Sequence, residues 1–297
     1  MTYHPGSLLG VSRWARYGLL LAFCFVTLAL HGCAGMVTQR LGGALSGAIA
    51  NQDDPETVRA GAPAYLLLID GLIADSPDDK STLLAGSRLY GSYAAIFVDD
   101  DKRALQMALK ARDYARRGLC ADYPQICEVE SAPYDQFVPA LHEVQADGLD
   151  ALYVYGTAWA GRIQADSSDW AAVADLPKVE AVMRRVVAMD PAYDNGRAQL
   201  YLAVLNTLVP PSLGGRPEVG RGYFEKAIEI SQGRDLMAKV EFARRYARMT
   251  FDRQLHDTLL HEVLAEKSRV AGLVLSNVLA QQEAAKLLAS SNDYFLE

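Results

Sequence analysis

The sequence has almost none of the short runs that mark β-strands, in which Val, Ile or Thr alternate with polar residues between tight turns. From about residue 63 onward, helical patterns recur instead, separated by a few Pro, Asp, Gly or Ser residues. The scarcity of strand patterns argues against sandwiches, barrels and parallel sheets. We therefore predict an all-α fold of stacked antiparallel helical hairpins.

Catalytic motifs are lacking as well. There is no G-x-S-x-G elbow, and the segments LHEVQA (141–146) and LHEVLA (260–265) have alanine where the zinc-binding H-E-x-x-H helix has its second histidine. His256 and His261 are five residues apart, which puts them off a common helix face. Acid pairs such as Asp78–Asp79 precede helices, where capping explains them. The sequence therefore predicts no enzyme activity, no metal and no cofactor.

An excess of basic residues is also missing. The chain has 29 Lys and Arg against 36 Asp and Glu. Nucleic-acid binding depends on neutralising phosphates with basic side chains, so this balance argues against it. After the N-terminal region, no apolar stretch looks long enough to span a bilayer. We therefore expect membrane attachment through a lipid alone.

The N-terminus has the pattern of an export signal. Arg13 and Arg16 precede the apolar run YGLLLAFCFVTLALHGC. The run ends in Leu30-His31-Gly32-Cys33, which resembles the lipobox of bacterial lipoproteins except at His31. This resemblance implies a signal peptide over 1–32 and lipidation of Cys33; an ordinary cleaved signal is the alternative. Ala34 is not the aspartate of the inner-membrane retention signal, so we expect a periplasmic protein anchored to the outer membrane.

Removal of residues 1–32 would leave 27 basic residues against 36 acidic ones, a net charge of −9. The Gly-rich segment 33–62 is expected to be a tether, and residues 63–297 the helical domain. Cysteine is scarce in that domain, where Cys120 and Cys127 flank ADYPQI. In an oxidising compartment this spacing favours a disulfide that closes a small loop. Two free buried thiols are the alternative.

Helix-length segments follow one another through the domain, with Pro177 suited to the first turn of the sixth. The expected helices cover 63–75, 79–98, about 99–120, 134–144, 148–164, about 174–189, about 194–208, about 217–231, about 233–250, about 252–266 and about 271–290. The two expected helices 194–208 and 217–231 carry small and aromatic residues in an arrangement typical of tetratricopeptide-type repeats. Because the periods elsewhere are irregular, we predict a degenerate tetratricopeptide-like repeat.

The segment SLGGRPEVGRG (212–222) has the glycine spacing of a phosphate-binding loop. A phosphate loop follows a strand and carries Lys and then Ser or Thr, whereas this segment follows a helix and carries Arg221 and Gly222. Pro217 would remove one of the backbone donors. We interpret the segment as the corner between two helices.

Aromatic residues gather in the middle of the chain, and they are either core or the wall of an apolar groove. Tyr155 and Arg162 lie off the helix face that carries Trp159, so we expect these two side chains to be exposed. The cluster consists of Tyr153, Tyr155, Trp159, Trp170, Tyr193, Tyr201 and Tyr223. The candidate binding residues are Tyr153, Tyr155, Trp159, Arg162, Tyr201 and Asn206.

Several segments resemble the T component of tripartite ATP-independent periplasmic transporters, the TatT family. The most specific are PPSLGG (210–215) and AQQEAAKLLASSNDYF (280–295), and the resemblance also covers CADYPQIC (120–127) and the lipoprotein start. The resemblance implies a tetratricopeptide-like periplasmic lipoprotein that binds the substrate-binding protein of the transporter. It also implies a homo-oligomer, with a trimer as one possibility, and a hydrophobic carboxylate-type small molecule as ligand. The alternative is an outer-membrane scaffold for envelope assembly without a small ligand.

Overall fold

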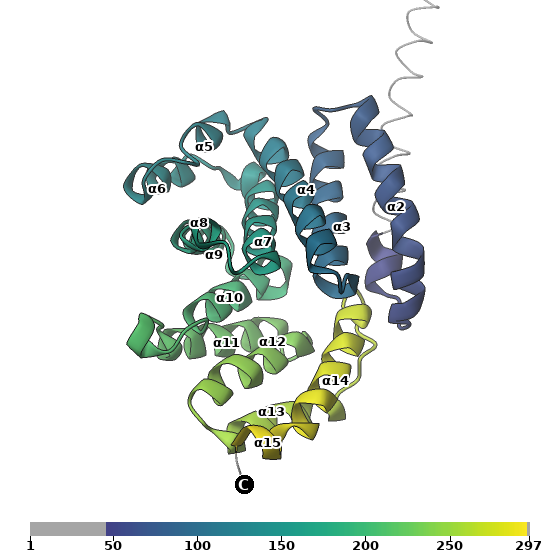
Figure 1. Ribbon diagram of the computed structural model, residues 1–297, viewed down its shortest axis with the longest axis vertical. Coiled ribbons are helices and arrows are strands. Elements are labelled where there is room, and N and C mark those ends of the chain that lie inside the picture. Colours follow the sequence, from purple (N-terminus) through teal and green to yellow (C-terminus); the bar gives the residue numbers. More distant parts are fainter. Residues whose placement is uncertain (1–45, 296–297) are drawn as a thin grey trace, which may run out of the picture. The chain divides into compact units, whose positions relative to one another are not determined.

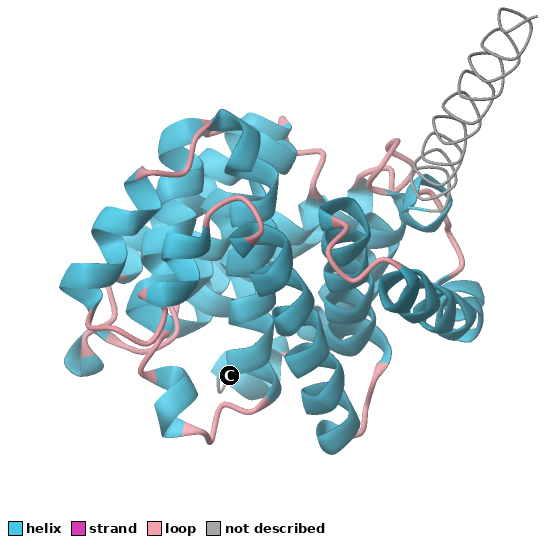
Figure 2. Cartoon of the chain, turned by 90° about the horizontal axis from the view of Figure 1, so that it is seen from above, coloured by secondary structure: helices cyan, strands magenta, loops and turns pink. Residues whose placement is uncertain are grey.

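The computed structural model describes residues 46–295, and this part of the chain is all-α, with no strand (Figures 1 and 2). The proposed signal segment and Cys33 lie outside the described residues. The helices are α2 (Pro55–Asp75), α3 (Lys80–Phe97), α4 (Asp101–Cys120), α5 (Pro124–Glu128), α6 (Tyr134–His142), α7 (Leu149–Ala165), α8 (Trp170–Val173), α9 (Leu176–Met189), α10 (Tyr193–Asn206), α11 (Pro217–Ser231), α12 (Leu236–Glu241), α13 (Arg253–Ala265), α14 (Val274–Ala289) and α15 (Ser291–Phe295).

Consecutive helices pack in pairs, as expected for stacked hairpins. Helix α3 packs against α4, α9 against α10, α10 against α11, and α13 against α14. The described residues therefore confirm the all-α prediction, and the stacked pairs are consistent with a helical repeat. The series also returns to its beginning, because α14 contacts α2 and its Leu275 joins the apolar core formed by α2, α3 and α4 (Figure 1).

Aspartate caps explain where several helices begin. The side chains of Asp54, Asp79 and Asp100 accept hydrogen bonds from the backbone N–H groups of Glu56, Thr82 and Arg103, at 3.0, 2.8 and 2.8 Å. Each such bond satisfies one of the N–H groups that the first turn of a helix leaves without a partner. Proline at the first position of α2, α5 and α11 fits the same turn.

Helix α2 starts eight residues earlier than the expected position 63, so the later part of the expected tether is helical. At 21 residues it is long and apolar enough, by length and composition, to cross a membrane, which corrects the expectation that no such stretch follows the N-terminal region. However, Leu66 and Ile73 are buried in the core, and the Asp70 carboxylate accepts hydrogen bonds from Tyr90 and Tyr114. These contacts make α2 part of the folded domain.

Candidate functional site

Tyr155 and Trp159 of α7 lie in the main apolar core. They are 0% and 1% exposed, and their rings meet edge-on with centroids 5.3 Å apart. The indole also packs edge-on against Phe137, and the Arg112 guanidinium lies 4.6 Å from its centroid. The expectation that Tyr155 is exposed is therefore wrong. Helices α3, α4 and α9 all pack against α7, so this helix has little outward face.

Arg162 and Asn206 hold local structure. The Arg162 side chain is only 15% exposed, so its expected exposure is also wrong, and its Nη2 donates to Asp169 Oδ2 at 2.6 Å. Backbone hydrogen bonds at the start of α8 and the bond from Arg162 lower the pKa of Asp169. Asn206 is buried at the end of α10. Its Nδ2 donates a hydrogen bond to Leu202 O, and its backbone carbonyl accepts one from the Arg216 N–H.

Tyr153 and Tyr201 come together with Tyr193 in a group that we call the tyrosine cluster. The ring centroid of Tyr153 is 5.2 Å from that of Tyr193 and 6.4 Å from that of Tyr201. The Tyr153 hydroxyl donates to Asp194 Oδ2 at 2.8 Å. Burial, with Tyr201 and the Asp194 carboxylate nearby, raises the pKa of Tyr153 well above its usual value. Trp170 is 82% exposed on α8, so of the two alternatives left open for the aromatic residues, a place in the core does not hold for Trp170.

The backbone beside the tyrosine cluster is unusual. Asp194, Asn195 and Gly196 have φ values of 48°, 58° and 78°, in the left-handed region that favours glycine, asparagine and aspartate. A Cβ at Gly196 would lie 3.0 Å from the side chain of Ile230 on α11. This turn places the Asp194 carboxylate against Tyr153.

Arg197 follows this turn and extends the polar network to α12 and α14. Its Nε donates to Asp235 Oδ2 at 2.9 Å and its Nη2 to Ser276 Oγ at 3.1 Å. Burial lowers the pKa of Arg197, but the charges of Asp235 and Asp194 outweigh this effect and raise it overall. The Arg197 side chain is still 32% exposed, and Tyr201 is half-buried. Both side chains are therefore only partly buried, at the edge of this polar network.

The segment Leu208–Val219, here called the corner, joins α10 to α11. The Arg216 N–H donates to Asn206 O at 2.9 Å, and the Gly215 N–H donates to Pro210 O at 3.1 Å. A Cβ at Gly215 would lie 1.7 Å from Val209 O, so the backbone approach here requires glycine. Because a helix rather than a strand enters the segment, the interpretation as a corner between two helices is confirmed.

Apolar side chains of the corner face outward on this fixed backbone. Leu213 is 72% exposed, and Leu208, Val209 and Val219 are also exposed. Pro210 and Pro211 between them are exposed as well, and both have restricted φ angles. A protein surface of this kind, apolar and ordered before binding, is suited to contact with another protein.

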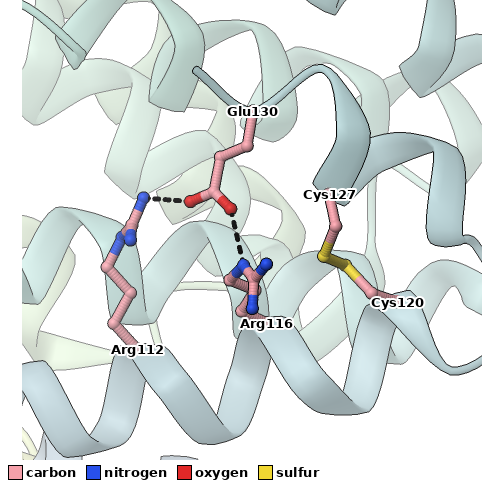
Figure 3. Close-up of a disulfide and its surroundings, with 5 residues drawn as sticks. All are labelled: Arg112, Arg116, Cys120, Cys127 and Glu130. Carbon is pink, nitrogen blue, oxygen red and sulfur yellow. Dashed lines mark hydrogen bonds and ion pairs between the residues drawn. A yellow bond between two sulfur atoms is a disulfide. The ribbon is translucent and has the colours of Figure 1, made fainter.

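A disulfide joins Cys120 at the end of α4 to Cys127 in α5, with Cα atoms 6.0 Å apart (Figure 3). Beside it, the Glu130 carboxylate accepts a hydrogen bond from Arg116 Nε at 2.9 Å and pairs with Arg112 (Figure 3). An open pocket of about 400 Å³ lies next to the disulfide, lined by the end of α4, by α5 and by Asp78 and Leu83 around the start of α3. Among residues 46–295, no group of three or more His, Cys, Asp or Glu side chains could hold a metal ion.

The stacked helix pairs are consistent with a helical-repeat protein, and the corner gives it an exposed apolar surface on an ordered backbone. A family model described as TRAP transporter T-component (TAtT) matches residues 51–295, and the chain belongs to this family. The family is a transporter accessory component and not an enzyme family, which makes transporter components its expected partners and suggests a periplasmic or envelope location. The chain is also similar to an uncharacterized protein of Treponema pallidum (strain Nichols), with 24% identity over 264 residues that cover 83% of this chain and 82% of the relative.

Proposed function

We propose that this protein is a non-enzymatic periplasmic component that binds the substrate-binding protein of a TRAP-type transporter through its corner. The exposed, ordered apolar side chains around Leu213 are the observation that carries this proposal. Family membership makes a transporter component the expected partner. In this proposal the lipid on Cys33 holds the protein at the outer membrane, and the helical domain extends into the periplasm.

The corner has the properties of a binding hot spot. Protein interfaces gain most of their free energy from a few side chains that become fully desolvated, and binding costs less when the backbone is already ordered. The hydrogen bonds from Gly215 and Arg216 fix the corner before any partner arrives. The ion pair between Arg216 and Glu180 of α9 ties it to the neighbouring hairpin.

Replacing Leu213 with glutamate is expected to raise the Kd for the substrate-binding protein at least about 10-fold, because a charge would replace a desolvated leucine. The partner would be recovered from periplasm on the immobilised protein and identified by mass spectrometry. The Kd would then be measured with the purified pair. Leu264→Glu, at an exposed leucine on α13, is the matched control and should leave the Kd unchanged.

An unchanged Kd for Leu213→Glu would remove the corner from the proposal. Recovery of envelope-assembly factors without any substrate-binding protein would instead favour the alternative, a scaffold for envelope assembly.

The tyrosine cluster supports a second role, in which the protein holds or channels a hydrophobic small molecule. Tyr201 and Arg197 would contact the molecule, because both side chains are partly exposed and lie beside the ordered network of Asp194 and Asp235. Tyr155 and Trp159 would not contact it, because the core covers them completely.

Native mass spectrometry of the protein purified from periplasm is expected to show a small molecule retained on the folded chain. Tyr201→Ala should lower the retained fraction several-fold, because it removes a partly exposed aromatic ring. Tyr65→Ala, at an exposed tyrosine on α2, is the control and should retain as much as the wild type. Equal retention by both variants, or a wild-type protein free of any small molecule, would contradict this role.

A further inference from the structure

The end of the chain carries a sequence pattern that the corner and the tyrosine cluster do not explain. Residues 290–295, here called the C-terminal segment, end the stretch AQQEAAKLLASSNDYF and include α15, which packs against α13 and α14. The serine, asparagine and aromatic side chains of this segment all contact one small set of residues. This set, here called the His256 group, consists of Arg248, Arg253, His256 and Asp257.

His256 lies at the centre of this contact. Its side chain is 0% exposed, and the Phe295 ring meets it edge-on with the ring centroids 5.3 Å apart. Arg248 Nε donates a hydrogen bond to His256 Nε2 at 3.3 Å. The hydrogen of the imidazole is therefore on Nδ1, which lies 2.8 Å from Asp257 Oδ1 and donates to it. This bonding pattern requires the neutral form of His256.

The charged members of the His256 group hold the C-terminal segment in place. The Arg248 guanidinium lies 4.5 Å from the centre of the Tyr294 ring, so a movement of Arg248 would break this contact. The Tyr294 hydroxyl donates to Arg248 O at 3.3 Å. Three side-chain hydrogen bonds complete the attachment: Arg248 Nη2 to Ser290 Oγ at 3.0 Å, Ser291 Oγ to Asp257 Oδ1 at 2.8 Å, and Arg253 Nη2 to Asn292 Oδ1.

Charges surround His256 on the helices packed around it. Arg248 follows the π-helical turn Phe242–Ala247, and Arg253 and Asp257 lie on α13 with His256 itself. The two arginines oppose a positive charge on the imidazole, whereas Asp257 favours one. Within residues 46–295, Arg248 forms no ion pair with a carboxylate, so its charge has no direct counterion. Further titratable groups on these helices are Arg244, His261, Glu283, Lys286, Asp293 and Tyr294.

A proton on His256 Nε2 would break the hydrogen bond from Arg248. Two N–H donors would then face each other at the site of the present 3.3 Å contact, and both would carry a positive charge. Arg248 would have to move away from His256. Its contacts with Ser290 and Tyr294 would be lost with this movement.

The direction of the pH dependence follows from the pKa of His256. Burial lowers this pKa below its ordinary value of about 6.5, and Arg248 and Arg253 lower it further, although Asp257 raises it. Once the segment is released, the imidazole is exposed and regains its ordinary pKa, so the released form binds a proton more readily. The closed form is therefore fully favoured above about pH 6.5 and loses stability as the pH falls below that value.

Asp257 does not change its charge over the same range. Burial raises the pKa of Asp257, but hydrogen bonds from His256, Ser291 and Arg253 lower it overall. The carboxylate is therefore already ionised, and His256 is the member of the group that takes up the proton.

We propose that the C-terminal segment is a proton-controlled closure, which is held in place while His256 is neutral and released when His256 is protonated. The proposal is independent of the corner and of the tyrosine cluster, which use other residues.

Hydrogen exchange of the backbone amides measures the release, with each rate corrected for the intrinsic rate at the same pH. From about pH 7.5 to about pH 5.5, the protection factors of residues 290–295 are expected to fall about 3- to 10-fold, because the proton favours the released form. Those of residues 208–219, in the corner, should stay the same. His256→Gln should abolish the fall, because an amide does not titrate. His142→Gln, at an exposed histidine on α6, is the matched control and should show the full fall.

NMR titration of the His256 ring gives a second test, which does not depend on whether His256→Gln folds. The wild-type imidazole is expected to titrate below about pH 6.5. Phe295→Ala removes the ring that covers His256 and should raise its pKa toward the ordinary value. Trp170→Ala, at an exposed aromatic residue on α8, should leave the pKa of His256 unchanged.

Protection factors that stay constant over this pH range would overturn the proposal, as would a fall that persists in His256→Gln. An equal fall in the corner would indicate acid unfolding of the whole domain and would also overturn it. A wild-type His256 that titrates at or above about pH 6.5, or a low pKa that survives Phe295→Ala, would have the same consequence.

Discussion

Replacing Trp159 with alanine is expected to lower the free energy of unfolding by about 3–5 kcal/mol, which would make it one of the most damaging single changes in the chain. The indole is 1% exposed and packs against Phe137, Tyr155 and the Arg112 guanidinium. Alanine would leave a cavity among α4, α6 and α7. Removal of the indole would also leave Arg112 without its aromatic neighbour.

Urea unfolding followed by circular dichroism measures this loss, and Trp170→Ala is the matched control. Trp170 is 82% exposed on α8, so the same substitution there should change the free energy of unfolding by less than about 0.5 kcal/mol. If Trp159→Ala lowered the free energy of unfolding only slightly and also abolished retention of the small molecule, Trp159 would be a ligand-binding residue. The expected large loss instead assigns it to the core.

Several helix boundaries could be predicted from the sequence, because N-cap residues and prolines act within a few residues of the helix start. Asp79 and Asp100 cap α3 and α4, and Pro217 opens α11, close to the expected boundaries. Helix α2 carries an equally local signal in Asp54-Pro55, an N-cap followed by proline at the first position, which would have located its true start. The continuation of the helix through Pro63 concealed it.

The candidate site was less readable, because exposure depends on which helices pack together. Helical spacing placed Tyr155 away from Trp159, which is sound for a helix with one buried face. In the structure, helices α3, α4 and α9 all pack against α7, so more than one face of α7 is buried. The spacing of apolar residues within 148–164 does not show how many other helices will pack against this segment. The short helices α5, α8 and α15 span five residues or fewer, which is too short for a period to appear.

The left-handed turn beside the tyrosine cluster could be predicted in part: its backbone conformation could, but its contacts could not. The segment Asp194-Asn195-Gly196 consists of the three residue types that most readily adopt positive φ, and this composition could have indicated the turn. Its consequences could not have been inferred, because the bond from Tyr153 to Asp194 and the bonds from Arg197 to Asp235 and Ser276 join helices far apart in the sequence.

Replacing Gly215 with alanine is expected to raise the Kd for the substrate-binding protein at least about 10-fold and to lower the free energy of unfolding by about 1–3 kcal/mol. A Cβ at this position would lie 1.7 Å from Val209 O and 2.7 Å from Val209 C. Both atoms belong to the backbone, so no side-chain rotation relieves the contact. The corner must move, and Leu213 and Val209 move with it.

Gly222→Ala, seven residues further along, is the matched control. Gly222 lies in α11, and a Cβ there meets no atom of the described chain within 4 Å apart from its own helix. Alanine should therefore favour the helix by about 0.5–1 kcal/mol and leave the Kd unchanged. Calorimetric titration with the partner and hydrogen exchange over residues 208–219 distinguish the two variants. If Gly215→Ala altered exchange in the corner yet bound as tightly as Gly222→Ala, the partner would not depend on the shape of the corner. A parallel loss of binding and of corner protection would instead show that the ordered backbone, and not apolar composition alone, makes this surface a binding site.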